Sequence, residues 1–141
     1  ERMVPARTDG TVLIVDADNF KRINDEWGPA VGDETLIAMA DAISAALRSN
    51  DIVARVGGEE FAIFAEETAA SRALELAERV RQKVSGTVNV WRRPVTVSVG
   101  LAVTAAAVDR EVLLQAADDA VYEAKRNGRN CVAMANLARA A

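Results

Sequence analysis

Two acidic positions, far apart in the sequence, could carry out metal-dependent chemistry if the fold brings them together. Asp16 follows a run of mostly β-branched residues, 11–15, which predicts a buried central strand that ends at this carboxylate. Glu59 and Glu60 lie between two apolar runs, where the chain is expected to turn. Neighbouring carboxylates repel each other unless a cation or a donor lies between them, and Mg²⁺ prefers oxygen ligands. If the two strands are neighbours, these residues predict a magnesium site.

The turn itself is marked by Gly57-Gly58, between the apolar runs 52–56 and 61–65. Two glycines favour a tight I′ turn, in which both take positive φ, so the segment predicts a β-hairpin. A purely structural hairpin would be more stable with Lys or Thr than with two glutamates at its tip, so we interpret the tip as the edge of an active site. Asp16 has a plainer interpretation, in which its carboxylate caps the following helix.

The amino-acid composition limits the kinds of catalytic and metal-binding chemistry that the chain can carry out. The chain of 141 residues contains no histidine, and Cys131 is its only cysteine. This excludes imidazole catalysis, zinc sites of the His or Cys type and an intrachain disulfide, and leaves carboxylates, Lys, Arg and an oxygen-bound metal. A net charge of −4 disfavours a nucleic-acid partner, and no apolar run is long enough to span a membrane. We expect residues 1–141 to form one domain, an N-terminally truncated fragment of a longer protein.

The elements that must position the acidic residues alternate along the chain. Apolar alternation and helical spacing predict strands over 11–15, 51–56, 60–65, 87–91, 95–104 and 130–134, and helices over 20–27, 31–48, 68–84 and 109–126. The order βααββαββαβ, in which 87–91 and 95–104 form a second hairpin and one hairpin is a small supplement, predicts an α/β sandwich with a mixed, largely antiparallel central sheet. Helical spacing also places Phe20 and Trp27 on one face of the first helix, and directs Leu74, Ala77, Val80 and Val84 inward.

Gly57-Gly58-Glu59-Glu60-Phe61 resembles the signature of GGDEF domains, the diguanylate cyclases, and the resemblance extends from about Val12 to Val132. It implies a fold like that of the nucleotidyl cyclases and polymerase palms. It also implies that Asp16, the backbone carbonyl of Ala17 and Glu59 bind Mg²⁺, or Mn²⁺ in its place. Glu60 would assist at a second metal, and Glu59 would position and deprotonate the attacking 3′-hydroxyl.

The same resemblance implies a GTP site. The helix start that contains Asn19 and Phe20 would cradle the triphosphate, as helix N-termini favour anions, and Lys21 would stabilise the transition state. A carboxylate accepts from guanine N1 and N2, so Asp33 would select guanine. The further substrate contacts that the resemblance implies are Asn24 at the base, Leu36 in the pocket wall, and Lys125 and Arg129 at the terminal phosphates.

Each of these positions also has a simple structural interpretation. An isolated helix lysine such as Lys21 is usually solvated, Asp33 begins a long helix, and cations such as Lys125 favour a helix C-terminus. The chain departs from the family at Pro29, where many members have His, which changes the rim of the expected pocket.

Arg48 and Asp51 form an RxxD pattern just before the hairpin, and Arg79 follows on the next predicted helix. The resemblance implies an inhibitory product site, in which Arg stacks on guanine and grips phosphate while Asp accepts from the base. The alternative is an exposed Arg–Asp pair of little energetic value.

The resulting hypothesis is a diguanylate cyclase that joins two GTP molecules into cyclic di-GMP and releases pyrophosphate. It requires a homodimer, an upstream sensory or regulatory domain, and a cytoplasmic location, with membrane tethering left open for the full-length protein. The family's N-terminal motif around Leu-Thr-Gly-Leu is absent, so we expect the isolated domain to be slow. The alternatives are a non-catalytic receptor for cyclic di-GMP or GTP, an enzyme that makes a mixed purine dinucleotide, and a purely structural domain.

Overall fold

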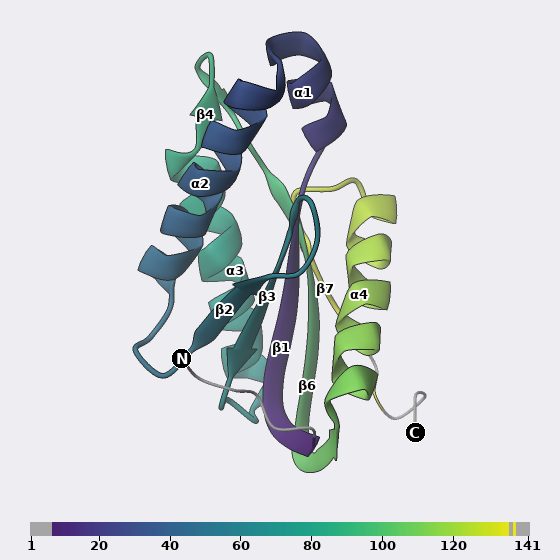
Figure 1. Ribbon diagram of the computed structural model, residues 1–141. Helices are drawn as coiled ribbons and strands as arrows, with labels where there is room; N and C mark the ends of the chain where they lie inside the picture. Colours follow the sequence, from purple (N-terminus) through teal and green to yellow (C-terminus); the bar gives the residue numbers. More distant parts are fainter. Residues whose placement is uncertain (1–6, 136, 138–141) are drawn as a thin grey trace.

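The computed structural model describes residues 7–135 and residue 137, which form one central sheet with helices on both faces (Figure 1). Helix α4 covers one face, and α2 and α3 cover the other. The helices are α1 (Phe20–Trp27), α2 (Pro29–Ala46), α3 (Ala70–Thr87) and α4 (Arg110–Arg126). The strands are β1 (Arg7–Ala17), β2 (Ile52–Arg55), β3 (Glu60–Ala65), β4 (Asn89–Val90), β5 (Arg93–Pro94), β6 (Val97–Asp109) and β7 (Val132–Met134).

The main sheet has the order β2-β3-β1-β6-β7, with β1 at its centre. Only β6 and β7 are parallel, and the other three pairings are antiparallel. Leu13 and Val15 of β1 pack into the core beneath α2 and α3, while Val12 and Ile14 pack beneath α4. The strand is therefore buried on both faces, as its β-branched run predicted, and the mixed, largely antiparallel α/β architecture is confirmed.

The second hairpin differs from the prediction. Residues 87–91 were expected to pair with 95–104, but β4 pairs with the short β5 in a separate two-stranded sheet, and β6 joins the main sheet beside β1. Trp91 and Arg92 both have positive φ, 49° and 67°, in the two-residue loop. This is the backbone of a I′ turn, and the hairpin has two residue pairs before the chain continues into β6.

The tip at Gly57-Gly58 is not the predicted I′ turn, because neither glycine has the positive φ that such a turn needs. The last strand pair is Arg55 with Phe61, so the loop is longer than two residues. The Arg55 guanidinium donates to the carbonyl oxygens of Gly57 at 3.2 Å and Gly58 at 2.6 Å. A wide loop held by its own arginine therefore replaces the tight turn.

Helix α1 lies beyond the end of the sheet, so only part of it reaches the core (Figure 1). Phe20 is buried, but Trp27, predicted on the same inward face, is 42% exposed and stacks on Trp91 with ring centroids 5.2 Å apart. Gly28, with φ of 87°, ends α1, and Pro29 begins α2, where its missing N–H costs nothing. Among residues 7–135 and 137, no helix combines the length and apolar character needed to cross a bilayer.

Candidate active site at the end of the central strands

The acidic residues singled out from the sequence lie at one end of β1 and β3. These strands are antiparallel neighbours, and their register places Asp16 opposite Glu60. The backbone N–H of Ala17 donates to the carbonyl oxygen of Glu59 at 3.3 Å, which joins the hairpin tip to the end of β1. The fold thus meets the condition that the magnesium hypothesis required, a shared edge for Asp16 and the tip glutamates.

Asp16 is 7% exposed, and its two oxygens have different surroundings. Oδ2 accepts from the Nζ atom of Lys125 at 2.9 Å, in an ion pair between β1 and the last turn of α4. Oδ1 is buried without a hydrogen-bond partner among the described residues. Burial raises the pKa of Asp16 above its ordinary value, and Lys125 only partly opposes this effect. An unpaired buried carboxylate oxygen of this kind is suited to a cation.

The two tip glutamates are electrostatically coupled to Asp16. Burial raises the pKa of Glu59, and the nearby charge of Asp16 raises it further. The pKa of Glu60 is raised for the same two reasons, in the same order, with Asp118 of α4 as a further contributor. The edge therefore holds more negative charge than Lys125 neutralises.

These residues fit a divalent ion. No group of three or more Asp, Glu or Cys side chains in the described part of the chain is already gathered around one point. The ligand set expected here needs only the carboxylates of Asp16 and Glu59 and the carbonyl of Ala17, since Mg²⁺ takes its other ligands from water and phosphate. The unpaired oxygen of Asp16 and the raised pKa values of Asp16 and Glu59 fit a position that a cation would stabilise.

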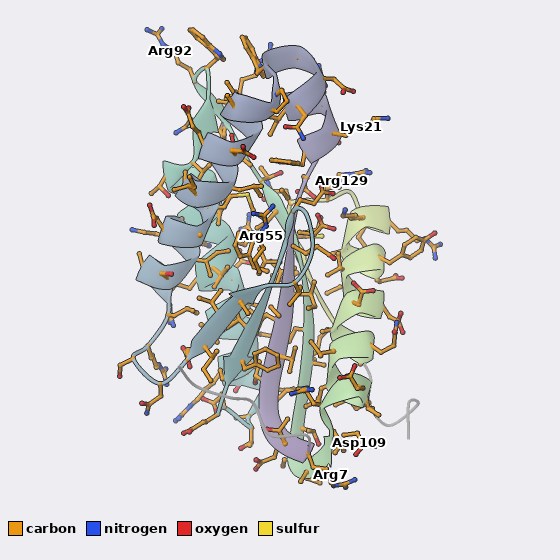
Figure 2. The ribbon with its side chains drawn as sticks, viewed as in Figure 1. Arg7, Lys21, Arg55, Arg92, Asp109 and Arg129 are labelled. Atoms are coloured by element: carbon orange, nitrogen blue, oxygen red, sulfur yellow. The ribbon has the colours of Figure 1, made fainter. Side chains whose placement is uncertain are left out.

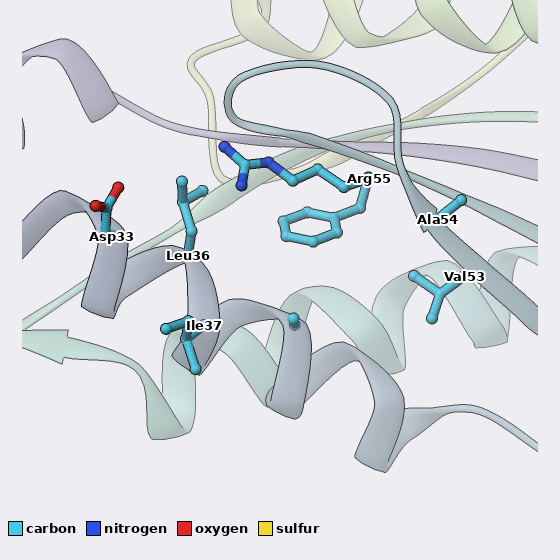
Figure 3. Close-up of a pocket in the computed structure, with 8 residues that line it drawn as sticks. Asp33, Leu36, Ile37, Val53, Ala54 and Arg55 are labelled. Carbon is cyan, nitrogen blue, oxygen red and sulfur yellow. The ribbon is translucent and has the colours of Figure 1, made fainter.

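A groove of about 630 Å³ lies between α2 and the hairpin. Figure 3 shows Leu36 between Asp33 on α2 and the guanidinium of Arg55, which reaches across from β2. The remaining lining residues are mostly apolar: Ile37, Ala40, Val53, Ala54 and Phe61. An apolar wall with one carboxylate at its edge can hold a purine and accept hydrogen bonds from it.

Arg55 is a site residue that the sequence analysis missed. It both lines the groove and holds the tip carbonyls, as described above. Its position two residues before Gly57 was the available signal, because a long cation there can reach the carbonyl oxygens of the loop.

Asn24 does not line this groove but lies against Gly32, one residue before Asp33. A Cβ atom at Gly32 would be 1.9 Å from Oδ1 of Asn24, so a larger residue there would displace this amide. The Asn24 side chain therefore lies against the N-terminal part of α2, the helix that also carries Asp33.

The predicted phosphate contacts occupy two elements at the same end of the molecule. Figure 2 shows Lys21 at the start of α1 and Arg129 after α4 at that end, and both are exposed. Asn19 has the left-handed backbone, with φ of 57°, that turns the chain from β1 into α1. The Phe20 side chain belongs to the core, so only its backbone can face a ligand.

The predicted inhibitory residues line a separate hollow of about 270 Å³. Arg48, Asp51 and Arg79 all contribute to it, and the backbone N–H of Arg48 donates to Oδ2 of Asp51 at 2.9 Å. The Nε atom of Arg79 donates to the carbonyl of Ala46 at 2.9 Å. Ala65, at the end of β3 away from the acidic edge, is also part of the lining. The two sites therefore occupy opposite ends of one strand.

The fold and the acidic edge define a class of protein, an α/β domain that presents carboxylates, cations and a purine-sized groove at the end of a mixed sheet. Comparison with known proteins gives the family. Residues 2–131 match the family described as "Diguanylate cyclase, GGDEF domain", and the chain belongs to it. The resemblance inferred from Gly57-Gly58-Glu59-Glu60-Phe61 is thereby confirmed.

Among curated relatives, the chain is 44% identical to the response regulator PleD of Caulobacter vibrioides over 128 residues, which is 86% of this chain and 28% of PleD. It is 39% identical to the probable diguanylate cyclase DgcT of Escherichia coli over 137 residues, 93% of this chain and 30% of DgcT. The chain thus spans less than a third of these relatives. The GGDEF domain of DgcB from Caulobacter crescentus, solved with cyclic di-GMP, superposes with a TM-score of 0.79 at 32% identity, covering 88% of this chain and 76% of that one.

Proposed function

We propose that this domain catalyses the condensation of two GTP molecules into cyclic di-GMP with release of two pyrophosphates. The observation that carries the proposal is the register of β1 and β3, which places Asp16 opposite Glu60 with one buried carboxylate oxygen unpaired. Family membership and the names of the relatives support it.

In each of two equivalent steps, the 3′-oxygen of one GTP would form a bond to the α-phosphorus of the other. The bond from that phosphorus to pyrophosphate breaks, and the 3′-hydroxyl proton leaves. We assign the acceptance of that proton to Glu59, whose raised pKa makes it a better base than an ordinary carboxylate. Asp16, the carbonyl of Ala17 and Glu59, with Glu60 beside them, would hold a divalent ion, which would supply charge neutralisation at the phosphates.

The remaining site residues bind and orient the nucleotide. Asp33 would accept from the guanine edge in the groove that Leu36 lines, with Asn24 beside it. Lys125 and Arg129 would hold the terminal phosphates, with the backbone of Asn19 and Phe20 and the Lys21 side chain near the reacting phosphorus. Lys125 is already drawn to the acidic edge by its 2.9 Å contact with Asp16, so it can exchange that partner for phosphate.

Each domain offers one acidic edge and one purine groove, while the reaction needs two nucleotides face to face. We therefore propose that two copies of the domain act together, brought into contact by an upstream sensory or regulatory domain. A relative from Pseudomonas aeruginosa, the diguanylate cyclase SiaD, was solved with its activator SiaC, which supports regulation through partners. Because GTP is the proposed substrate, we place the domain in the cytoplasm.

The hollow that contains Arg48, Asp51 and Arg79 is proposed as a product site. Two arginines and a carboxylate match the phosphates and guanine edges of cyclic di-GMP. The hollow is distant from the acidic edge along β3, so occupation there would inhibit by restraining the domains rather than by competing for the groove.

The test is to fuse the domain to a dimerising coiled coil and measure cyclic di-GMP by mass after incubation with GTP and Mg²⁺. The expected product is cyclic di-GMP, formed in the fusion and lost in its Glu59→Gln variant. A dimer that binds GTP or cyclic di-GMP but forms no product would instead identify a receptor, and a product of another mass would indicate a mixed dinucleotide.

A further inference from the structure

Asp18 is a second buried carboxylate at the end of β1, two residues beyond Asp16 and 5% exposed. Unlike Asp16, it is surrounded by donors. Oδ1 accepts from the hydroxyl of Ser98 at 2.6 Å, and Oδ2 accepts from the hydroxyl of Thr96 at 2.7 Å. Oδ2 also accepts from the backbone N–H of Asn130 at 3.0 Å. One side chain therefore joins the end of β1, the start of β6 and the turn after α4.

That turn has an unusual backbone. Gly128, Arg129 and Asn130 have φ of 115°, 64° and 47°, so three successive residues lie in the positive region. Asparagine adopts positive φ more readily than most residues, but for an arginine such as Arg129 this conformation costs free energy and is held by the surrounding structure. Such a turn would relax to another shape without specific restraints.

Hydrogen bonds from two other parts of the chain, besides those to the end of α4, restrain the turn. The N–H of Arg129 donates to the carbonyl of Ala124 at 3.1 Å, within the end of α4. The Oδ1 atom of Asn130 accepts from Nη1 of Arg81 on α3 at 2.8 Å. The bond from the Asn130 N–H to Asp18 is the restraint that connects the turn to the strand end bearing Asp16.

We infer that Asp18 is a positioning residue, whose buried carboxylate clamps the turn 128–130 to the acidic edge and so holds Arg129, together with Lys125 at the end of α4, where the terminal phosphates bind. This inference rests on the proposed function, since it concerns the triphosphate of the same site. Asp18 itself touches neither substrate nor metal in this role, and its hydroxyl and amide partners occupy both of its oxygens.

A carboxylate is well suited to this task. An ionised carboxylate only accepts hydrogen bonds, so it can satisfy two hydroxyls and one amide N–H at once, and bonds to a charged acceptor are stronger than neutral ones. In Asp18→Asn the shape is kept, but one oxygen becomes an NH₂ group that donates. The Asn130 N–H or a hydroxyl then loses its acceptor.

The test compares two ligands that share guanine but differ in their phosphates. Affinities for GMP and for the non-reacting α,β-methylene analogue of GTP are measured calorimetrically with Mg²⁺ for wild type, Asp18→Asn and the matched control Asp41→Asn, an exposed carboxylate on α2. We expect Asp18→Asn to weaken the triphosphate analogue at least about tenfold and GMP less than about twofold. Asp41→Asn should change neither, and amide exchange at Asn130 should accelerate only in Asp18→Asn.

A double-mutant cycle tests whether Asp18 acts through Arg129. In an Arg129→Ala background, Asp18→Asn should cost much less affinity for the analogue than it does alone, because the group that it positions is gone. If Asp18→Asn does not fold, Thr96→Val removes one of the three donors and should shift the ratio of the two affinities in the same direction.

The outcomes are distinct. An unchanged ratio of triphosphate to GMP affinity, or an equal loss of both, would overturn the positioning role and leave the proposed function standing. A wild-type domain that binds neither ligand in Mg²⁺ would overturn the proposed function itself.

Discussion

Asp16 and Asp18 are two residues apart and almost equally buried, yet their surroundings are opposite. Asp16 has a buried oxygen with no partner within the described residues, one lysine contact and a raised pKa. Asp18 has three uncharged donors around its carboxylate. The surroundings of Asp16 leave a negative charge that a cation would stabilise. The oxygens of Asp18 are already hydrogen-bonded, and these bonds join three chain segments. Burial of a carboxylate therefore does not by itself distinguish a candidate metal ligand from a structural residue. In this pair, the number of hydrogen-bond donors around the carboxylate makes the distinction.

The largest expected effect is on the acidic edge. Replacing Glu59 by Gln, or Asp16 by Asn, should lower cyclic di-GMP formation by at least about 100-fold, because the proposed base or metal ligand is lost. The measurement is pyrophosphate release by the coiled-coil fusion, with Asp41→Asn as the matched control. Turnover close to that of wild type in either variant would contradict the assignment of this edge.

The effects of the two carboxylates on stability should follow the opposite order to their effects on activity. Asp18→Ala should lower the free energy of unfolding by about 2–4 kcal/mol, since it leaves three buried or partly buried donors without their acceptor. Asp16→Ala, in metal-free protein, should change it by less than about 1 kcal/mol, because Lys125 can then be solvated. Urea denaturation in the presence of a chelator measures both. Equal losses in the free energy of unfolding would mean that both carboxylates mainly stabilise the fold.

The hollow at the other end of β3 should respond independently of either carboxylate. Arg48→Ala should weaken cyclic di-GMP binding about tenfold, through loss of one charged contact, and leave Mg²⁺-dependent affinity for the GTP analogue unchanged. Calorimetry with each ligand separates these effects, and Arg7→Ala, whose ion pair with Asp109 lies elsewhere, is the control. A parallel loss of GTP-analogue affinity would show that the two sites are not separate.

The smallest effect concerns pH. The pKa of Glu60 is raised in the folded protein, so its charged form is disfavoured by folding, and this cost is present above the folded pKa and disappears as the pH falls through it. Glu60→Gln should therefore raise the melting temperature at neutral pH by up to about 4 °C without metal. Below pH 4.5, the ordinary glutamate value, the difference should vanish. Thermal melts across this range in chelator measure it, and a gain that grows as the pH falls would contradict the sign.

Helical spacing identified the long helices, but not every buried position on them. On α3, Ala77, Val80 and Val84 are fully buried as predicted, whereas Leu74 is 38% exposed and Leu76 is buried in its place. The spacing defines a face only to within part of a turn, and the neighbouring strands and helices decide where that face is covered. The sequence marked Asp16 and the tip glutamates as candidates through short local motifs, whereas the contacts of Arg55 and Asp18 involve segments that no such motif connects.

Residue order alone was enough to predict the alternating elements and the mixed sheet, because turn residues and apolar periods are local properties of the chain. The family was predicted from the resemblance of the motif Gly57-Gly58-Glu59-Glu60-Phe61. Residue order also marked Asp16 and the tip glutamates as candidates, since adjacent carboxylates at a hairpin tip repel each other unless a cation or a donor lies between them. The wide loop at Gly57-Gly58, the I′ turn at Trp91-Arg92 and the contrast between Asp16 and Asp18 were established only by the folded structure. Each depends on atoms from distant segments, and no local pattern specifies which donors will reach a given carboxylate.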